Sequence, residues 1–177
     1  MSKAALKKEL LTFTGPQLVE VILNAYDASK EAKAYFEFFL NPDVDKLLDK
    51  KIDIIAKELT RAKRGTSKAR ISHIRKEIKE FEAYGVGPEK TSELIYAVLC
   101  MLIGQYRHLH YPEALLKGTF KLTHDYIVHA DSSEILETAL ENLRKIIENK
   151  NIGTASIRES VRHTMMNTIQ ELADKRQ

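Results

Sequence analysis

The chain has 177 residues, of which 44% are hydrophobic and 30% charged, and its 28 Lys and Arg residues against 25 Asp and Glu give a net charge of +3. Such a composition argues against disorder, and the single cysteine excludes an intramolecular disulfide framework. The longest wholly apolar run, Leu94 to Ile103, has ten residues where a membrane helix needs about 20, so we expect a cytoplasmic protein without a membrane segment.

Apolar residues recur at helical spacing along almost the whole chain, and no stretch alternates in the way that a strand requires. Pro16 and Pro88 stand where helices can begin, because the missing N–H of proline costs nothing at a first helical position. In chain order, the expected helices cover about Lys3–Thr12, one from Pro16, Lys30–Leu40, Asp43–Lys63, one from Ser67 to Gly85, one from Pro88, Pro112–Ala130, one from Asp131 and one after Gly153.

The helix expected from Pro88 contains the run Leu94–Ile103, which is hydrophobic on every side, so we expect this helix at the centre of the fold. The connections are only two to six residues long, which makes consecutive helices antiparallel neighbours. The sequence therefore predicts an all-α fold, an irregular antiparallel helical bundle or array of about eight to nine helices, in a single domain over residues 1–177. A solenoid-like stack of helix pairs is the alternative.

A basic segment between Lys57 and Lys79 is the clearest anomaly of the composition. It holds nine basic residues against two acidic ones, an excess of +7 in a chain whose net charge is +3. Charge concentrated in this way suits phosphate, nucleic acid or an acidic protein surface. The nine are Lys57, Arg61, Lys63, Arg64, Lys68, Arg70, Arg75, Lys76 and Lys79.

Ser67 is predicted to cap the second of two helices that this segment forms, since its hydroxyl can accept an N–H of the first turn. The free N–H groups and the positive dipole end at that point favour an anion. The leading hypothesis is a non-enzymatic interaction protein that presents the hairpin 57–79 to an acidic or phosphate-bearing partner. Its expected binding residues are Arg61, Arg64, Ser67, Lys68, Arg75 and Lys79.

Two other interpretations of the basic segment stay open. A nucleic-acid-binding protein can use the same side chains for contacts to the phosphate backbone. However, no aromatic residue stands between Phe39 and Phe81, so stacking on bases has no local support. The segment can also be an ordinary solvated face of two surface helices.

Four histidines, His108, His110, His124 and His129, fall within 22 residues and raise a third hypothesis, a metal- or small-molecule-dependent enzyme. Their spacings of two and five residues do not align them on one helix face, and no zinc-binding signature is present. Cys100 lies in the apolar run, where a thiol is unreactive, and no acid–base pair of carboxylates stands out. We therefore expect no metal, no cofactor and no catalytic residues.

Tyr35, Phe36, Phe38 and Phe39 place four aromatic side chains within five residues. One narrow buried face cannot hold all four, and we expect this helix to pack between two others. The alternative is that part of the helix faces a partner chain or a groove, which makes a homodimer a candidate assembly.

Four stretches of the first half of the chain stand out: LKKEL from Leu6, QLVEVIL from Gln17, YFEFFLNP from Tyr35 and KARISHIRKEIKEF from Lys68. In these stretches the chain resembles an uncharacterised bacterial family known only as a domain of unknown function. The resemblance implies a compact, all-helical cytoplasmic protein. It implies no activity and supplies no catalytic residues.

Overall fold

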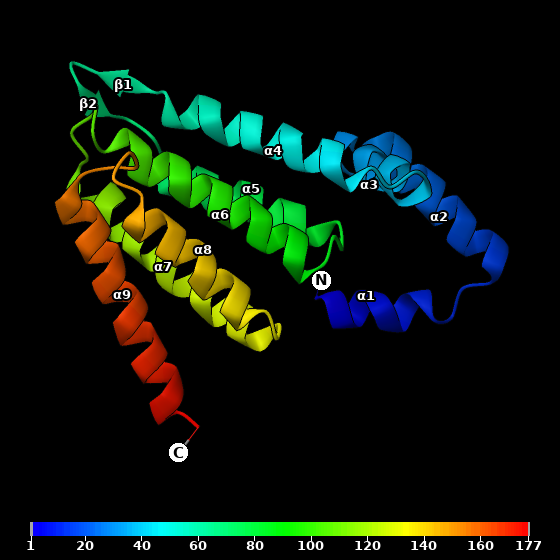
Figure 1. Ribbon diagram of the computed structural model, residues 1–177. Helices are drawn as coiled ribbons and strands as arrows, with labels where there is room; N and C mark the ends of the chain where they lie inside the picture. The colour runs from blue at the N-terminus through cyan, green and yellow to red at the C-terminus, as the bar shows by residue number, and fades with distance from the viewer. Residues whose placement is uncertain (1, 177) are drawn as a thin grey trace. The chain divides into compact units, whose positions relative to one another are not determined.

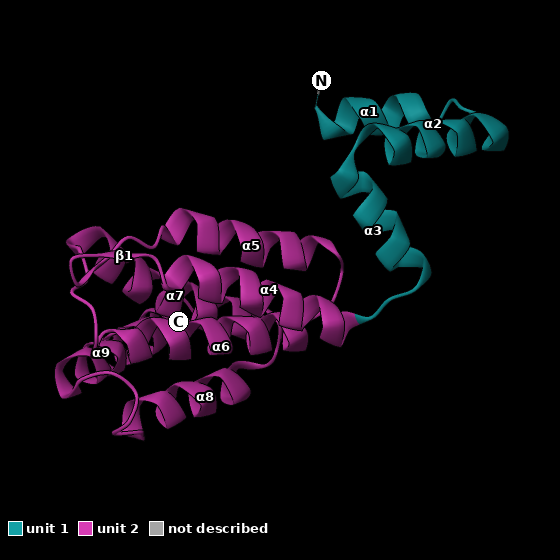
Figure 2. Ribbon diagram, turned by 90° about the horizontal axis from the view of Figure 1, so that it is seen from above, with its two compact units in different colours: residues 1–43 teal, residues 44–177 magenta. Residues whose placement is uncertain are grey.

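The computed structural model describes residues 2–176 (Figure 1). Over these residues the chain forms nine helices and one two-stranded hairpin, which confirms the predicted all-α array. None of the described helices is both long enough and apolar enough to cross a membrane. The chain divides into two compact units, residues 1–43 and residues 44–177 (Figure 2), and the single domain expected over residues 1–177 stays a prediction.

The first unit consists of α1 (Lys3–Leu10), α2 (Gly15–Ala28) and α3 (Lys30–Leu40). Short polar side chains begin these helices: Ser2 Oγ accepts the N–H of Ala5 at 3.2 Å, and Ser29 Oγ accepts the N–H of Ala32 at 3.2 Å. α2 and α3 contact each other, but no residue of the three helices is buried.

The second unit is a bundle of six helices around α6. Its elements are α4 (Val44–Leu59), β1 (Ala62–Lys63), β2 (Thr66–Ser67), α5 (Ile71–Ala83), α6 (Pro88–Gln105), α7 (Glu113–Ser132), α8 (Leu136–Glu148) and α9 (Ala155–Asp174). Each of these helices contacts the next along the chain, as the short connections predict. α6 contacts α4, α5, α7 and α8, so it lies at the centre of this unit, as its apolar sequence predicts.

A buried lysine joins α4 to α5. Lys51 is 6% exposed, and its Nζ lies 2.6 Å from Glu77 Oε2 and 2.8 Å from Glu80 Oε2. Burial alone would lower the pKa of Lys51, but the hydrogen bonds to the two carboxylates outweigh it, so the pKa is raised and the lysine stays charged. Glu77 is one of only two acidic residues in the basic segment, and it pairs with Lys51 of another helix.

The end of α4 differs from the prediction. The helix expected to run to Lys63 ends at Leu59, and the expectation of no strand is wrong, because β1 and β2 pair as an antiparallel hairpin. Arg64 and Gly65 form its two-residue loop with φ of 51° and 73°, the geometry of a type I′ turn. Strands of two residues are too short to show any alternation in the sequence.

Two predicted helix starts are also wrong. Ser67 does not cap α5, which begins at Ile71; it lies in β2, is 1% exposed, and donates its N–H to the carbonyl oxygen of His110 at 2.9 Å. The helix expected from Asp131 begins at Leu136 instead, because α7 continues past Asp131.

Candidate functional site

Glu58, in the last turn of α4, is a buried carboxylate that binds both sides of the hairpin. Its Oε1 accepts hydrogen bonds from Arg61 Nη1 at 2.8 Å and from the backbone N–H and Nε of Arg70 at 2.8 and 3.0 Å. These hydrogen bonds lower the pKa of Glu58 to about 2, and the bond from the Arg70 guanidinium has the largest effect. Arg61 and Arg70 are therefore engaged within the protein, and the end of α4 is fixed to the start of α5.

The hairpin is hydrogen-bonded to the loop between α6 and α7. Thr66 forms a parallel bridge with His110. In this bridge the N–H of Ser67 donates to the carbonyl oxygen of His110 at 2.9 Å. The N–H of His110 donates in turn to the carbonyl oxygen of Gly65 at 2.8 Å. The backbone of His110 is thus part of the hairpin's support, while its side chain is exposed.

Arg107, in the same loop, reaches the loop between α8 and α9. Its Nε donates to the carbonyl oxygen of Gly153 at 3.1 Å, and its Nη2 donates to that of Lys150 at 2.6 Å. Three connections that are far apart in the sequence therefore lie together at one end of the bundle, on the side of β1 and β2 in Figure 1.

We call these connections, residues 60–70, 106–112 and 149–154, the basic end. They contain seven Lys and Arg residues and no Asp or Glu, whereas the connections 84–87 and 133–135 contain one Glu and no basic residue. Arg61 and Arg70 pair with Glu58, and Arg107 donates to carbonyl oxygens. The other four are exposed and make no ion pair or side-chain hydrogen bond to another described residue: Lys63, Arg64, Lys68 and Lys150.

The structure divides the predicted binding residues between two places. Arg61, Arg64, Ser67 and Lys68 belong to the basic end, whereas Arg75 and Lys79 lie farther along α5. The backbone N–H groups of residues 67–70 all donate to oxygens of the protein, so the free helix N-terminus on which the anion site was predicted is not there. That these residues bind a partner stays a prediction.

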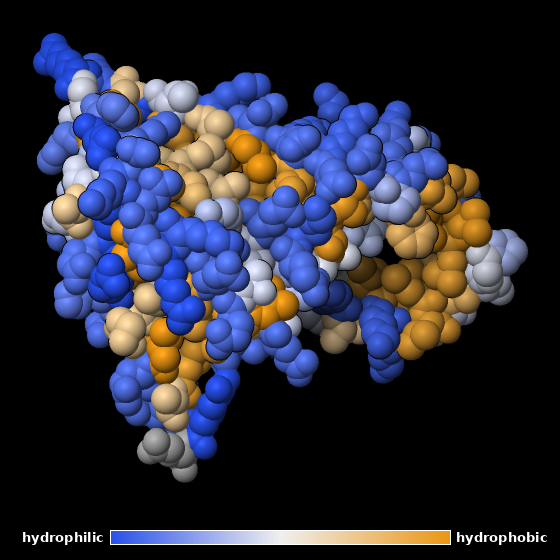
Figure 3. All heavy atoms as spheres, viewed as in Figure 1, coloured by the Kyte–Doolittle hydropathy of each residue, from blue (hydrophilic) through white to orange (hydrophobic). Residues whose placement is uncertain are grey.

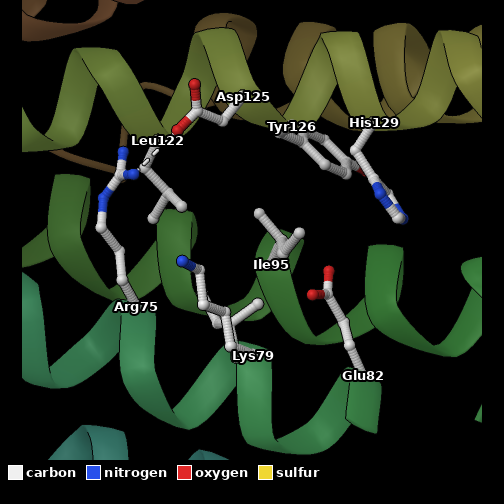
Figure 4. A pocket seen from close by; sticks show the side chains of 9 residues that line it. Arg75, Lys79, Glu82, Ile95, Leu122, Asp125, Tyr126 and His129 are labelled. Carbon is white, nitrogen blue, oxygen red and sulfur yellow. Dashed lines mark ion pairs between the residues drawn. The ribbon is translucent and has the colours of Figure 1, made fainter. Parts of the chain in front are cut away.

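Arg75 and Lys79 line a cavity of about 160 Å³ between α5, α6 and α7 (Figure 4). Arg75 Nη1 lies 2.8 Å from Asp125 Oδ2 of α7. Burial would raise the pKa of Asp125, but hydrogen bonds from His124 and Arg75 outweigh it and lower the pKa. The whole lining is Arg75, Ile78, Lys79, Glu82, Ile95, Leu122, Asp125, Tyr126 and His129.

Two buried nitrogen atoms of the cavity lining, Arg75 Nη2 and His129 Nε2, have no hydrogen-bond partner among the described residues. An unsatisfied buried polar atom costs about 1–3 kcal/mol. Lys79 makes no ion pair with any described residue and is exposed. The cavity therefore combines an apolar floor with a cation at its rim and two unused polar atoms.

The four histidines are spread over three surroundings. His108 and His110 are exposed in the loop after α6, and His129 lines the cavity. His124 lies between Asp125 Oδ1 and Glu171 Oε2, each at 3.3 Å from one of its ring nitrogens. Over residues 2–176, no group of three or more His, Cys, Asp or Glu side chains is arranged to hold a metal ion.

Sequence reasoning missed Arg107 and Lys150 of the basic end. Both lie outside the basic segment, and only the hydrogen bonds between loops bring them to it. The one available signal was the position of each residue in a short connection of an antiparallel bundle, since alternate connections of such a bundle lie at the same end.

Replacing Glu58 by Gln tests whether its charge fixes the hairpin. We expect the free energy of unfolding to fall by about 2 kcal/mol at neutral pH, because a hydrogen bond to a charged group is worth about 1.5–3 kcal/mol. The pKa of Glu58 is lowered from 4.5 in the unfolded chain to about 2 in the folded protein. The contribution of Glu58 to the free energy of unfolding is therefore complete above pH 4.5 and is lost as the pH falls towards 2.

Urea denaturation of wild type and Glu58→Gln at neutral pH and at about pH 3 measures this effect. The difference in the free energy of unfolding between the two proteins should shrink at the lower pH. An equal difference at both pH values would contradict the role given to the charge of Glu58. Glu113→Gln is the control, since Glu113 has a side chain that is 79% exposed and should change the stability little at either pH.

Comparison with known proteins concerns residues 1–106, which match a family of unknown function (DUF6155). No curated protein and no solved structure matches the chain. The matched residues include the first unit, the basic segment and α6, and they contain all four of the stretches that carried the resemblance. The chain belongs to the family of unknown function DUF6155.

Proposed function

We propose that the protein is a non-enzymatic binding protein whose basic end contacts an acidic surface of a partner protein. The observation that supports this most is the distribution of charge, since seven basic and no acidic residues lie in three connections joined by hydrogen bonds. Four of these cations have no partner within the described part of the chain. Unpaired, exposed cations of this kind steer and orient an acidic partner.

The basic end is also held in place before any partner arrives. Glu58 accepts the backbone N–H of Arg70, and the hairpin is hydrogen-bonded to the backbone of His110. Arg107 donates to the carbonyl oxygen of Gly153 in the loop before α9. Ordering side chains and loops on binding costs affinity, and a surface that is already ordered avoids part of this cost. Lys63 and Arg64, at the tip of the type I′ turn, are therefore presented on a defined backbone.

A protein partner fits this surface better than a nucleic acid. The two tyrosine rings of the basic end, Tyr106 and Tyr111, stack edge to face on each other with centroids 5.3 Å apart. Tyr111 is 3% exposed, and its hydroxyl donates to the carbonyl oxygen of Leu102. Neither ring is placed as an open platform for bases, which single-stranded nucleic acids require for stacking. In the same proposal the protein works in the cytoplasm, which its single, partly buried Cys100 suits.

Charge reversal at the hairpin tests the proposal. Lys63→Glu, Arg64→Glu and Lys68→Glu together should weaken binding of a labelled poly-glutamate peptide by about tenfold or more, because three attractive contacts become repulsive. Fluorescence anisotropy at increasing salt measures the affinity, which should fall with salt for the wild type. Binding that survives the triple substitution unchanged would contradict the proposal.

The matched control reverses three exposed cations away from the basic end, Lys50→Glu, Arg144→Glu and Lys175→Glu, which changes the net charge equally. This variant should keep most of the affinity, and an equal loss would show that only net charge matters. Duplex DNA and single-stranded RNA are titrated beside the peptide. Tighter binding of either one at the same salt would replace the protein partner by a nucleic acid.

The cavity supports a second candidate function, binding of a small molecule that carries a carboxylate or phosphate group. Arg75 Nη2 and His129 Nε2 are the observation that favours it, because both are buried polar atoms without a partner in the described chain. An acidic group between them and Lys79 would supply the missing acceptor for Arg75. The cavity has room for a group of a few heavy atoms.

Lys79→Met tests the cavity without disturbing a described ion pair. We titrate inorganic phosphate and succinate in turn and follow the Arg75 Nε–H and His129 ring signals by NMR. The wild type should show saturable shifts at both residues, and Lys79→Met should weaken them several-fold. Lys76→Met, on the same helix but outside the cavity, should leave them unchanged. Absence of a saturable shift with both probes would remove this candidate.

A further inference from the structure

Residues 1–43 carry nearly all of the large apolar side chains that are exposed. Of ten such residues in the described chain, nine lie in this unit, and only Met166 lies in residues 44–177. In Figure 3 the hydrophobic spheres gather over the part of the molecule that α1 and α2 occupy in Figure 1. The nine are Leu6, Leu11, Val19, Val21, Ile22, Leu23, Tyr35, Phe39 and Leu40.

This unit has no core of its own. None of the residues of α1, α2 and α3 is buried, and the helices have only 8, 14 and 11 residues. Isolated helices shorter than about 12–15 residues are marginal in water, and chains below about 40 residues usually need disulfides, metals or oligomerisation to fold. The apolar side chains of the unit therefore need a further surface to cover them.

The side chains of α2 show that α3 alone does not cover them. α2 contacts α3, yet Val19 and Leu23, one helical turn apart, are 56% and 57% exposed. On α3, Phe39 of the aromatic stretch is 69% exposed. Exposed large apolar side chains gathered on neighbouring helices, unlike single scattered ones, mark a surface that another protein surface covers.

Two observations identify the covering surface. An apolar patch is matched by another apolar patch. Among the described residues after residue 43, Met166 is the one large apolar side chain that is exposed, whereas a second copy brings the same nine residues. The charge of the unit permits the contact, because five lysines and six acidic residues nearly cancel in residues 1–43. A patch that meets its own copy about a two-fold axis is the commonest form of symmetric dimer.

We propose that the protein forms a homodimer through residues 1–43, in which the α2–α3 pair of one protomer packs against that of its partner. Two such helix pairs make a four-helix arrangement that buries Val19, Leu23 and Phe39 of both protomers. This inference goes beyond the proposed function, because it concerns a different unit and a different kind of surface. It leaves the basic end of each protomer outside the interface residues.

Sedimentation equilibrium of the full chain tests the dimer. The wild type should give twice the protomer mass of 20.2 kDa, with a mass that changes little with salt. Val19→Glu with Leu23→Glu should weaken the dimer by about a hundredfold or more, because four charges would enter a shared apolar core. Both positions are exposed in the single chain, so these substitutions leave the packing of α2 on α3 in place.

Met166→Glu is the matched control, since Met166 is 57% exposed, as Leu23 is, but lies in the second unit. It should leave the dimer intact. Far-UV circular dichroism checks the helix content of each variant, and Leu40→Glu, at a position 72% exposed, is a second disruption should the double variant lose helix. A wild type that is monomeric throughout would overturn the proposal. A dimer that Met166→Glu breaks, but that neither Val19→Glu with Leu23→Glu nor Leu40→Glu weakens, would overturn it too. Poly-glutamate binding by the monomeric variant would separate the loss of the dimer from the proposed function.

Discussion

Glu58 is the residue on which the candidate surface depends. It is a carboxylate at the end of a helix, 6% exposed, and three donors of Arg70 and one of Arg61 surround it. A buried carboxylate without these donors would carry a large desolvation cost, so hairpin and carboxylate stabilise each other. Lys51, in the middle of α4, is likewise a buried charge, and it forms ion pairs with Glu77 and Glu80 of α5.

Acidic side chains of the protein itself decide which charges of the basic segment stay unpaired. Glu58 engages two arginines, Asp125 engages Arg75, and Glu80 lies 3.4 Å from Lys76, so the segment is partly neutralised by the protein itself. Lys63, Arg64 and Lys68 have no ion-pair partner among the described residues, and the loops after α6 and α8 add Arg107 and Lys150. The cationic surface is therefore smaller than the whole basic segment, but hydrogen bonds hold its backbone in place. The exposed apolar surface belongs mainly to residues 1–43.

Sequence reasoning predicted the helices, their order and the central α6 because each depends on local periodicity over two or more helical turns. The hairpin could not be predicted in this way, since each strand has two residues and its turn has Arg64 where Asn or Asp is usual. For the candidate site, proximity in sequence placed Arg61, Arg64 and Lys68 together. It failed for Arg75 and Lys79, which α5 carries to another face, and for Arg107 and Lys150, which only tertiary hydrogen bonds bring in.

Amide hydrogen exchange at the basic end tests most directly whether it is one fixed surface. The backbone N–H groups of Ser67, Arg70 and His110 donate to His110, Glu58 and Gly65, so they should exchange slowly. The N–H groups of Arg64 and Gly65, in the turn, should exchange quickly. Slow exchange of the first three and fast exchange of the other two is the predicted result. Equally fast exchange at all five would contradict the account, because the hairpin would then be a free loop.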